Sequence, residues 1–283
     1  MSKDRIAYNI FFDQSSTPLY LLGIKKFNIK SKTPCQFQVL RKDSTLFTKT
    51  ITPSSKDLLE ITIDLLKNDT VRIEFESERK ARIQKEHSNY IKSLPSQFVF
   101  VPSGSFTNQK KIDAFYISKH ETTQYLWKIV IGERSGYYVG KNRPVESVSW
   151  TKVQEFITNL NKLSGLKYRL PTSDEWQYAA MGGPGTRDSL YAQNMPIDSV
   201  CWYHKHNEKM TSLVGKLTPN SLGLYDMNGN VWEWCAGDPD DKRQIIRGGS
   251  LNNAAKYCSN IYYNVFNSSS GGSNIGFRLV LEQ

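Results

Sequence analysis

The last third of this chain has almost no regular hydrophobic pattern, and this feature restricts the possible folds more than any other. From Gly183 onward, Gly, Asn, Asp and Trp recur over roughly 90 residues, and the only strand-like pieces are 245–249 and 276–282. Buried loop backbone needs hydrogen-bond partners, so such a domain needs something that holds its loops in place. We expect buried tryptophans and bound cations to do so.

Upstream of this region the sequence predicts helices. Segment 149–165 has helical spacing and a terminal glycine, and segment 170–183 begins with capping Thr and Ser residues. A shorter segment that starts at Thr122 or Thr123 shows the same spacing, and 98–106 is typical of a strand. The apolar stripe of the longest helix consists of Trp150, Val153, Phe156, Ile157 and Leu160.

The first part of the chain contains short alternating runs of β-branched and aromatic residues, separated by turn formers, which is typical of a small all-β sandwich. We predict three parts: a β-sandwich spacer or docking domain (1–78), a helical linker (79–96) and an α+β domain (97–283). Residues 1–78 contain no His and only scattered carboxylates, so we expect no chemistry there. The predicted strands are 6–12, 19–24, 35–41, 46–52, 59–65 and 71–77.

The net charge of +10 is spread along the chain, because Lys and Arg exceed Asp and Glu by 17 to 11 in residues 1–94 and by 20 to 16 in residues 95–283. No DNA- or RNA-binding motif accompanies this charge, so we expect no specific nucleic acid. No apolar run is long enough to span a membrane. The N-terminus lacks an apolar signal segment, so we expect a cytoplasmic protein as synthesised, with assembly into a phage particle or a surface structure as an alternative.

Five motifs follow one another in the second domain, and together they resemble the formylglycine-generating enzyme (sulfatase-modifying factor) family. The resemblance covers about residues 97–283 and implies a C-type-lectin-like α+β fold. That fold has two helices, few strands, much ordered loop, and a C-terminal strand that returns beside the first one. The motifs are PVESVSW (144–150), RLPTSDEWQYAA (169–180), GLYDMNGNVWEWC (223–235), RGGS (247–250) and NIGFRLV (274–280).

The motif at 223–235 predicts a calcium site. Asp226 and Glu233 are oxygen donors on either side of a turn at Gly229, and hard cations prefer such carboxylates together with backbone carbonyls. The resemblance implies the ligands Asp226, Gly229, Val231 and Glu233, with carbonyl oxygens from Gly229 and Val231. Loop hydrogen bonds without a metal are the alternative. The family's other calcium site would fall near 202–207, where no ligands can be placed.

The enzymes of this family oxidise a client cysteine to formylglycine with O₂ and a copper ion held by two thiolates. The resemblance places these thiolates three and eight residues after Ser250, which are Asn253 and Cys258. One thiolate does not supply a two-coordinate Cu(I) site, because soft Cu(I) needs soft ligands. Cys201 and Cys235 belong to other motifs, and the first domain has no His for an iron site. We therefore predict no copper and no enzymatic activity, with Cys258 a vestigial, buried thiol.

Segment 251–275 stands where the family has its active site. Of its 25 residues, 16 are Asn, Ser, Tyr or Gly, a composition typical of adaptable binding surfaces. It resembles the variable proteins of diversity-generating retroelements, a branch of this family whose C-terminal segment is mutagenised at adenines; Lys256 departs from that pattern. The resemblance implies these ligand-contact residues: Asn252, Asn253, Tyr257, Ser259, Asn260, Tyr262, Tyr263, Val265, Phe266, Asn267, Ser268, Ser273 and Asn274.

Three hypotheses follow from the sequence. The favoured one is a non-catalytic binding protein that presents 251–275 to a protein or cell-surface ligand, while the N-terminal domain docks to a larger assembly. The second is a copper-dependent oxidase with an altered site around Cys258. The third is a structural assembly component that uses the fold only for packing.

Overall fold

The computed structural model describes two compact units, Met1–Asn89 and Tyr90–Gln283. The described residues are 8–12, 25–28, 35–41, 44–51, 58–64, 70–105, 110–185, 190–192, 195–206 and 210–282. The division between the units falls inside helix α1 (Glu76–Ser93), within the segment predicted as a linker. No helix in these ranges is long and apolar enough to cross a membrane.

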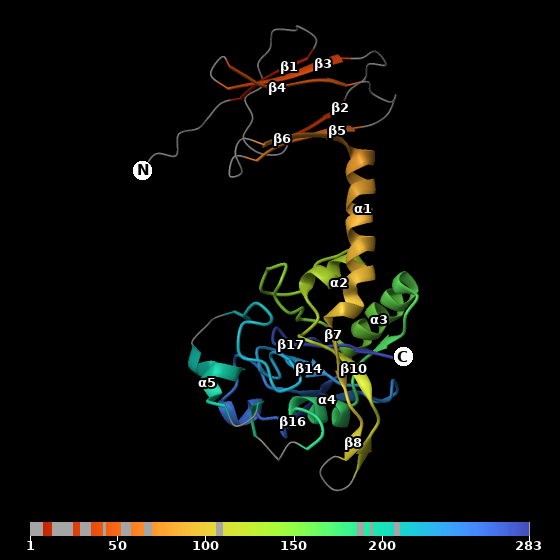
Figure 1. The fold of residues 1–283 in the computed structure, drawn as a ribbon, viewed down its shortest axis with the longest axis vertical. Coiled ribbons are helices and arrows are strands. Elements are labelled where there is room, and N and C mark those ends of the chain that lie inside the picture. The colour runs from red at the N-terminus through yellow and green to blue at the C-terminus, as the bar shows by residue number, and fades with distance from the viewer. Residues whose placement is uncertain are drawn as a thin grey trace. The chain divides into compact units, whose positions relative to one another are not determined.

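The N-terminal unit contains two three-stranded antiparallel sheets (Figure 1). One has the order β1-β3-β4, and the other has the order β2-β5-β6. Five of the six predicted strands are confirmed. The predicted strand 19–24 lies outside the described residues, and β2, which follows it, was not predicted. The strands are β1 (Tyr8–Phe12), β2 (Lys25–Asn28), β3 (Cys35–Arg41), β4 (Ser44–Ile51), β5 (Leu58–Asp64) and β6 (Thr70–Phe75).

In the C-terminal unit, a 3-10 turn, η1 (Leu94–Gln97), leads from α1 into a four-stranded antiparallel sheet with the order β11-β18-β10-β7. The C-terminal strand therefore shares a sheet with β7, as expected, but it does not lie beside it. β10 lies between them, since it pairs with β7 through four residues and with β18 on its other edge. The strands are β7 (Phe98–Val101), β10 (Phe115–Ser118), β11 (Tyr168–Arg169) and β18 (Val280–Leu281).

The region without hydrophobic periodicity forms a second four-stranded sheet, with the order β16-β15-β14-β17. Its loops are held by buried tryptophans, as predicted. Trp234 Nε1 donates to the Val148 carbonyl and Trp150 Nε1 to the Cys235 carbonyl, both at 2.9 Å. The strands are β14 (Trp232–Trp234), β15 (Arg243–Arg247), β16 (Tyr263–Asn267) and β17 (Ile275–Gly276). Two shorter pairs are β8 (Gly104–Ser105) with β9 (Lys111–Ile112), and β12 (Cys201–Trp202) with β13 (Asn228–Gly229).

The described part of this unit contains three helices of eight residues or more, one more than the two expected: α2 (Gln124–Ile131), α3 (Trp150–Ser164) and α4 (Ser173–Ala180). The additional one is the segment with helical spacing after Thr123, which caps it. α3 buries its whole predicted stripe and ends at Gly165 in the left-handed region, with φ of 73°. A further four-residue helix is α5 (Ile197–Val200), and the short 3-10 turns include η4 (His204–His206) and η5 (Ala255–Cys258).

The helices pack onto the C-terminal segment through aromatic rings. Trp127 of α2 stacks on Phe156 of α3 with 5.2 Å between ring centroids, and Phe277 meets Phe156 edge-on at 5.2 Å. All three side chains are buried in one core cluster, which also contains Trp232 and Trp234. This cluster links the helices to the sheet that carries segment 251–275.

A capping box fixes the start of α4. Thr172 Oγ1 accepts a hydrogen bond from the Glu175 N–H at 3.1 Å, and the Glu175 carboxylate accepts one from the Thr172 N–H at 2.8 Å. Glu175 also forms an ion pair with Arg169 at 2.7 Å. The box and the ion pair set the position of α4, which carries Trp176 into the core.

We expect Thr172→Ala to lower the free energy of unfolding by about 1 kcal/mol, because the Glu175 N–H loses its acceptor. Thr158→Ala, at an exposed position of α3, is the matched control and should change it by less than about 0.5 kcal/mol. Urea unfolding followed by tryptophan fluorescence measures this, since all six tryptophans lie in the C-terminal unit. Equal losses in the two variants would contradict a role for the cap.

Candidate functional site

Segment 251–275 forms an outer face of the C-terminal unit. Its strand β16 pairs with β15 and is the outer strand of its sheet among the described residues. Tyr263 is 56% exposed and Ile261 is 48% exposed. The Arg247 guanidinium lies 5.4 Å from the centre of the Tyr263 ring, which orients that ring on the surface.

Other aromatic side chains attach the segment to the core while remaining partly accessible. Tyr262 meets Tyr257 edge-on at 5.0 Å and lies 6.1 Å from Trp232, and Phe266 lies 6.0 Å from Trp234, all between ring centroids. Tyr257, Tyr262 and Phe266 are therefore half-buried and pack against the core cluster. The aromatic residues give the segment a fixed shape rather than that of a loose loop.

Two predicted contact residues are not on the surface. Ser259 and Asn260 are buried, with exposed fractions of 5% and 0%. The Asn260 side-chain oxygen accepts a hydrogen bond from Asn228 Nδ2 at 2.9 Å, and its N–H donates to the Leu190 carbonyl at 2.8 Å. Their assignment as ligand contacts is wrong, because both residues are buried, and Asn260 holds the segment onto the scaffold.

The other eleven predicted contact residues are at least partly accessible. Four are exposed: Asn252, Tyr263, Asn267 and Ser273. Seven are half-buried: Asn253, Tyr257, Tyr262, Val265, Phe266, Ser268 and Asn274.

Asn253, at the position of the first family thiolate, is held by local hydrogen bonds. Its side-chain oxygen accepts from Ser250 Oγ at 2.6 Å, and its N–H donates to the Ser250 carbonyl at 2.9 Å. Its carbonyl accepts from the His204 N–H at 3.1 Å. The Asn253 backbone carbonyl therefore ties 250–253 to η4, and among the described residues its side-chain amide bonds only to Ser250. Cys258, at the second thiolate position, is fully buried.

The structure brings Cys201 to Cys258, which the sequence did not predict. The Cys201 thiol is hydrogen-bonded to Cys258, and this contact together with burial raises the pKa of the Cys201 thiol far above its usual range. Both side chains belong to a small core cluster with Val200 and Tyr203. No spacing signal indicates the pair, because the two residues belong to motifs far apart in the sequence.

Glu233, predicted as a calcium ligand, is the centre of a buried ion pair. Its carboxylate accepts two hydrogen bonds from Arg278, at 2.6 and 2.7 Å, and one from Trp176 Nε1 at 2.6 Å. Glu233, Arg278 and Trp176 are all fully buried. Both carboxylate oxygens therefore already have strong donors.

Asp226 and Glu121 form a second buried acidic group next to this pair. Asp226 Oδ2 accepts from the Gly215 N–H at 2.6 Å, and the Asp226 and Glu121 carboxyl groups are near enough to share a proton in a hydrogen bond. Apart from each other, Asp226 Oδ1 and both Glu121 oxygens have no donor among the described residues. Burial raises the pKa of Asp226 to about 6 and raises that of Glu121 well above its usual range, with further contributions from the neighbouring carboxylates. Glu121 was not predicted, since its sequence context shows no sign that it is buried.

Gly229 follows Asp226 by three residues and has φ of 89°, as the predicted turn requires. A side chain there would collide with the Trp202 carbonyl, 1.9 Å from an ideal Cβ. Val231 is fully buried. Within the described ranges, no three or more His, Cys, Asp or Glu side chains are grouped so as to hold a metal ion.

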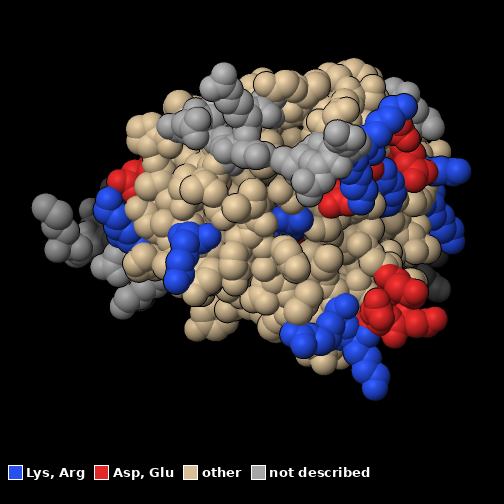
Figure 2. All heavy atoms as spheres, turned by 90° about the horizontal axis from the view of Figure 1, so that it is seen from below, with Lys and Arg blue, Asp and Glu red and all other residues tan. Residues whose placement is uncertain are grey.

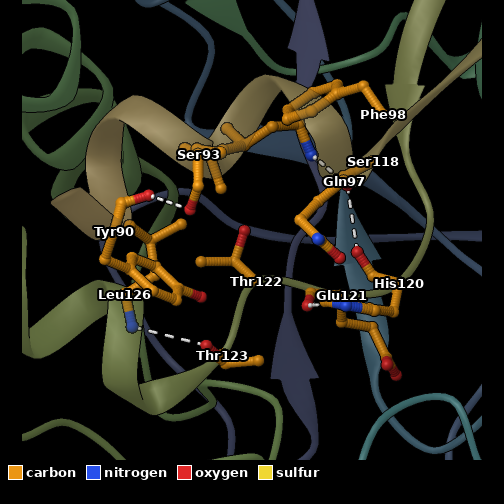
Figure 3. Close-up of a pocket in the computed structure, with 12 residues that line it drawn as sticks. Tyr90, Ser93, Gln97, Phe98, Ser118, His120, Glu121, Thr122, Thr123 and Leu126 are labelled. Carbon is orange, nitrogen blue, oxygen red and sulfur yellow. Dashed lines mark hydrogen bonds between the residues drawn. The ribbon is translucent and has the colours of Figure 1, made fainter. Parts of the chain in front are cut away.

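A cavity of about 220 Å³, which Glu121 also lines, lies between the end of α1 and the connection from β10 to α2 (Figure 3). Tyr90, Ser93 and Thr123 line it, together with His120, whose Nδ1 lies 3.0 Å from the Glu121 carbonyl. Burial lowers the pKa of His120, so its ring is neutral at pH 7. No residue of the predicted ligand or metal sites lines this cavity.

The fold of the C-terminal unit is a formylglycine-generating-enzyme fold of the C-type-lectin-like class. Residues 85–283 match the family of sulfatase-modifying factor enzyme 1-like domains, and the chain belongs to this family. Among solved structures, Treponema denticola variable protein 1 has a TM-score of 0.57 at 24% identity, over 65% of this chain and 93% of that one. CarF has a TM-score of 0.57 at 26% identity, over 66% and 98%.

Curated relatives carry several different names. Chaperone protein LppX of Paenibacillus barcinonensis is 27% identical over 252 residues, which cover 66% of this chain and 90% of the relative. The formylglycine-generating enzyme of Streptomyces coelicolor is 29% identical over 186 residues, and inactive C-alpha-formylglycine-generating enzyme 2 of Bos taurus is 29% identical over 173 residues. The chain spans only about half the length of the last two, 57% and 54%.

Asn260→Ala should lower the free energy of unfolding by about 1–3 kcal/mol, because it leaves the buried Asn228 amide without this acceptor. Asn252→Ala, the same change at an exposed position of the segment, should alter it by less than about 0.5 kcal/mol. Urea unfolding of both variants measures the difference. A costly Asn252→Ala together with a neutral Asn260→Ala would contradict the division of the segment into an anchoring side and an exposed side.

Proposed function

We propose that this protein is a non-catalytic binding protein that presents the exposed side of residues 251–275 to a protein or cell-surface ligand. The proposal is carried by Asn253. A carboxamide lies where the family's copper chemistry needs a thiolate, and its oxygen already accepts a hydrogen bond from the Ser250 hydroxyl. An uncharged amide oxygen is a poor ligand for Cu(I), so this site does not provide the two-thiolate coordination.

The chemistry of the exposed side supports binding. Lys256 is the single charged residue in 251–275, and the exposed positions present amide, hydroxyl and phenol groups together with the apolar side chain of Ile261. In the view from below in Figure 2, uncharged surface separates clusters of charged side chains, and further Lys or Arg side chains lie within it. Aromatic and small polar groups on a rigid support are suited to a protein or glycan surface.

The names of similar proteins also support a non-catalytic binding role. Two are named inactive formylglycine-generating enzymes, and the fold matches that of a protein named a variable protein. Some proteins similar to this one are thus named as inactive and still share its family domain. In this proposal the N-terminal unit docks the binding domain onto a larger assembly, such as a phage particle or a cell-surface structure.

We further propose that a calcium ion binds beside Asp226. The Asp226 Oδ1 and Glu121 oxygens have no donor other than each other's carboxyl group among the described residues, and they fit a hard cation, because three buried carboxylates face one guanidinium there. Asp226 and the Gly229 and Val231 carbonyls would hold the ion. Glu233 would contribute only in addition to its bonds with Arg278 and Trp176. When bound, the ion would neutralise this group and fix the loop 226–233.

The absence of catalysis is tested by incubating the reduced protein with Cu(I), O₂ and a cysteine-containing peptide. We expect no conversion of the peptide cysteine to formylglycine by mass spectrometry, at the same background as a Cys258→Ser variant. Asn253→Cys, which supplies the second thiolate of the family, should bind Cu(I) more tightly than the wild type. If the wild type converts more peptide than the Cys258→Ser variant does, the protein is an oxidase and the proposal is wrong.

Calcium should raise the melting temperature relative to the same protein in chelator, because an ion that binds only the native state stabilises it, by about 2.7 kcal/mol at a hundredfold excess over Kd. Asp226→Asn should abolish the shift. Asp240→Asn, at an exposed position, should retain it. If calcium and chelator give the same melting temperature in the wild type, the metal site does not exist.

A further inference from the structure

Two buried thiols from different motifs meet beneath segment 251–275. Cys201 lies on β12, and Cys258 ends η5. Both have an exposed fraction of 0% and are free thiols in this structure. The Cys201 thiol is hydrogen-bonded to Cys258, and the Cys258 thiol also lies 3.8 Å from the Ser250 carbonyl oxygen.

The surrounding backbone holds the two residues together independently of the thiols. Cys201 pairs with Asn228 in the parallel β12–β13 ladder. The Asn228 side chain donates to the Cys258 carbonyl at 2.7 Å and to Asn260 at 2.9 Å. A second link joins the same two regions, from the His204 N–H to the Asn253 carbonyl at 3.1 Å. One residue, Asn228, therefore fixes both partners of the thiol pair.

We propose that Cys201 and Cys258 form a disulfide bond. This pair is then a site of oxidative modification, and the bond links the candidate binding segment covalently to β12. The oxidant is a small disulfide such as oxidised glutathione. One thiolate attacks it and releases one reduced thiol. The other cysteine, as a thiolate, then displaces the second reduced thiol from the mixed disulfide. Two electrons pass to the oxidant, and the two protons of the cysteines end on its released thiols.

The contact between the sulfurs favours a disulfide over a metal site. A two-coordinate ion would have to lie between the sulfurs and would force apart two thiols that are already hydrogen-bonded to each other. Burial and a raised thiol pKa slow attack on the folded dithiol, because the thiolate is the reactive form. The bond therefore forms during folding or local opening, and burial then protects it from reductants.

The bond would close a loop that contains β13, β14 and β15 and would end directly beneath the exposed residues of 251–275. A cross-link of this kind restricts the unfolded chain and stabilises the native state, raising the melting temperature by about 5–10 °C. The stapled segment would keep its shape when exposed residues such as Tyr263 change. The bond does not depend on the identity of a ligand or on the proposed binding function.

The test uses the full-length protein refolded with either oxidised or reduced glutathione. Each sample is denatured, labelled with a maleimide without prior reduction and mapped by mass spectrometry. Of the four cysteines, we expect only Cys35 and Cys235 to be labelled after oxidation, with a cross-linked peptide that contains Cys201 and Cys258. The melting temperature should be higher in the oxidised sample.

Cys258→Ser should leave Cys201 open to labelling after oxidation, and Cys35→Ser should leave the cross-linked peptide unchanged. Labelling of all four cysteines after oxidation, or a bond that involves Cys35 or Cys235, would overturn the proposal. So would protection of Cys201 and Cys258 by added Cu(I) but not by oxidised glutathione, because that outcome would identify the pair as a metal site. Mapping of the wild type decides the question even if a variant fails to fold.

Discussion

The buried ion pair between Glu233 and Arg278 is the interaction on which the C-terminal unit depends. Arg278 donates to both Glu233 oxygens, to the Ser118 carbonyl at 3.2 Å and to the Tyr225 carbonyl at 2.9 Å, and Trp176 donates to the same carboxylate. One guanidinium therefore connects both four-stranded sheets, α4 and the loop before β13. A buried pair of this kind is strongly destabilising to break, by about 3–5 kcal/mol, since it leaves an uncompensated charge.

The groups that stabilise the fold are different from the groups that are exposed on segment 251–275. The helices, the tryptophans and the ion pair hold β14 and β15, and β16 and η5 are attached to them through half-buried aromatic rings. Nothing in this arrangement requires a particular side chain at Tyr263, Asn267 or Ser273. A domain built in this way can lose a catalytic thiolate and still present a shaped surface, which is the state that we propose for this protein.

The sequence predicted those parts of the fold that depend on local patterns. The stripe of α3, its end at Gly165 and the start of α4 follow from spacing and capping, and five strands of the N-terminal unit follow from alternation. The family motifs predicted the fold of the second unit. β10 and β2 were not predicted, because strands of four residues are too short to show a clear alternation.

The candidate site was predicted less completely. The exposed positions of 251–275 follow from composition, but the burial of Asn260 depends on Asn228, which lies in a different motif. Cys201 and Glu121 join their sites through contacts between segments far apart in the chain. Residue type and spacing alone assign neither of them.

The central claim is that the exposed side of 251–275 is a binding face that is independent of the scaffold. A display selection tests it most directly: Asn252, Tyr263, Asn267 and Ser273 are randomised together, and the library is panned against purified proteins. The account predicts folded binders that keep the melting temperature of the parent and lose binding when these four positions revert. Binders whose affinity survives that reversion, or a library that is largely unfolded, would contradict it.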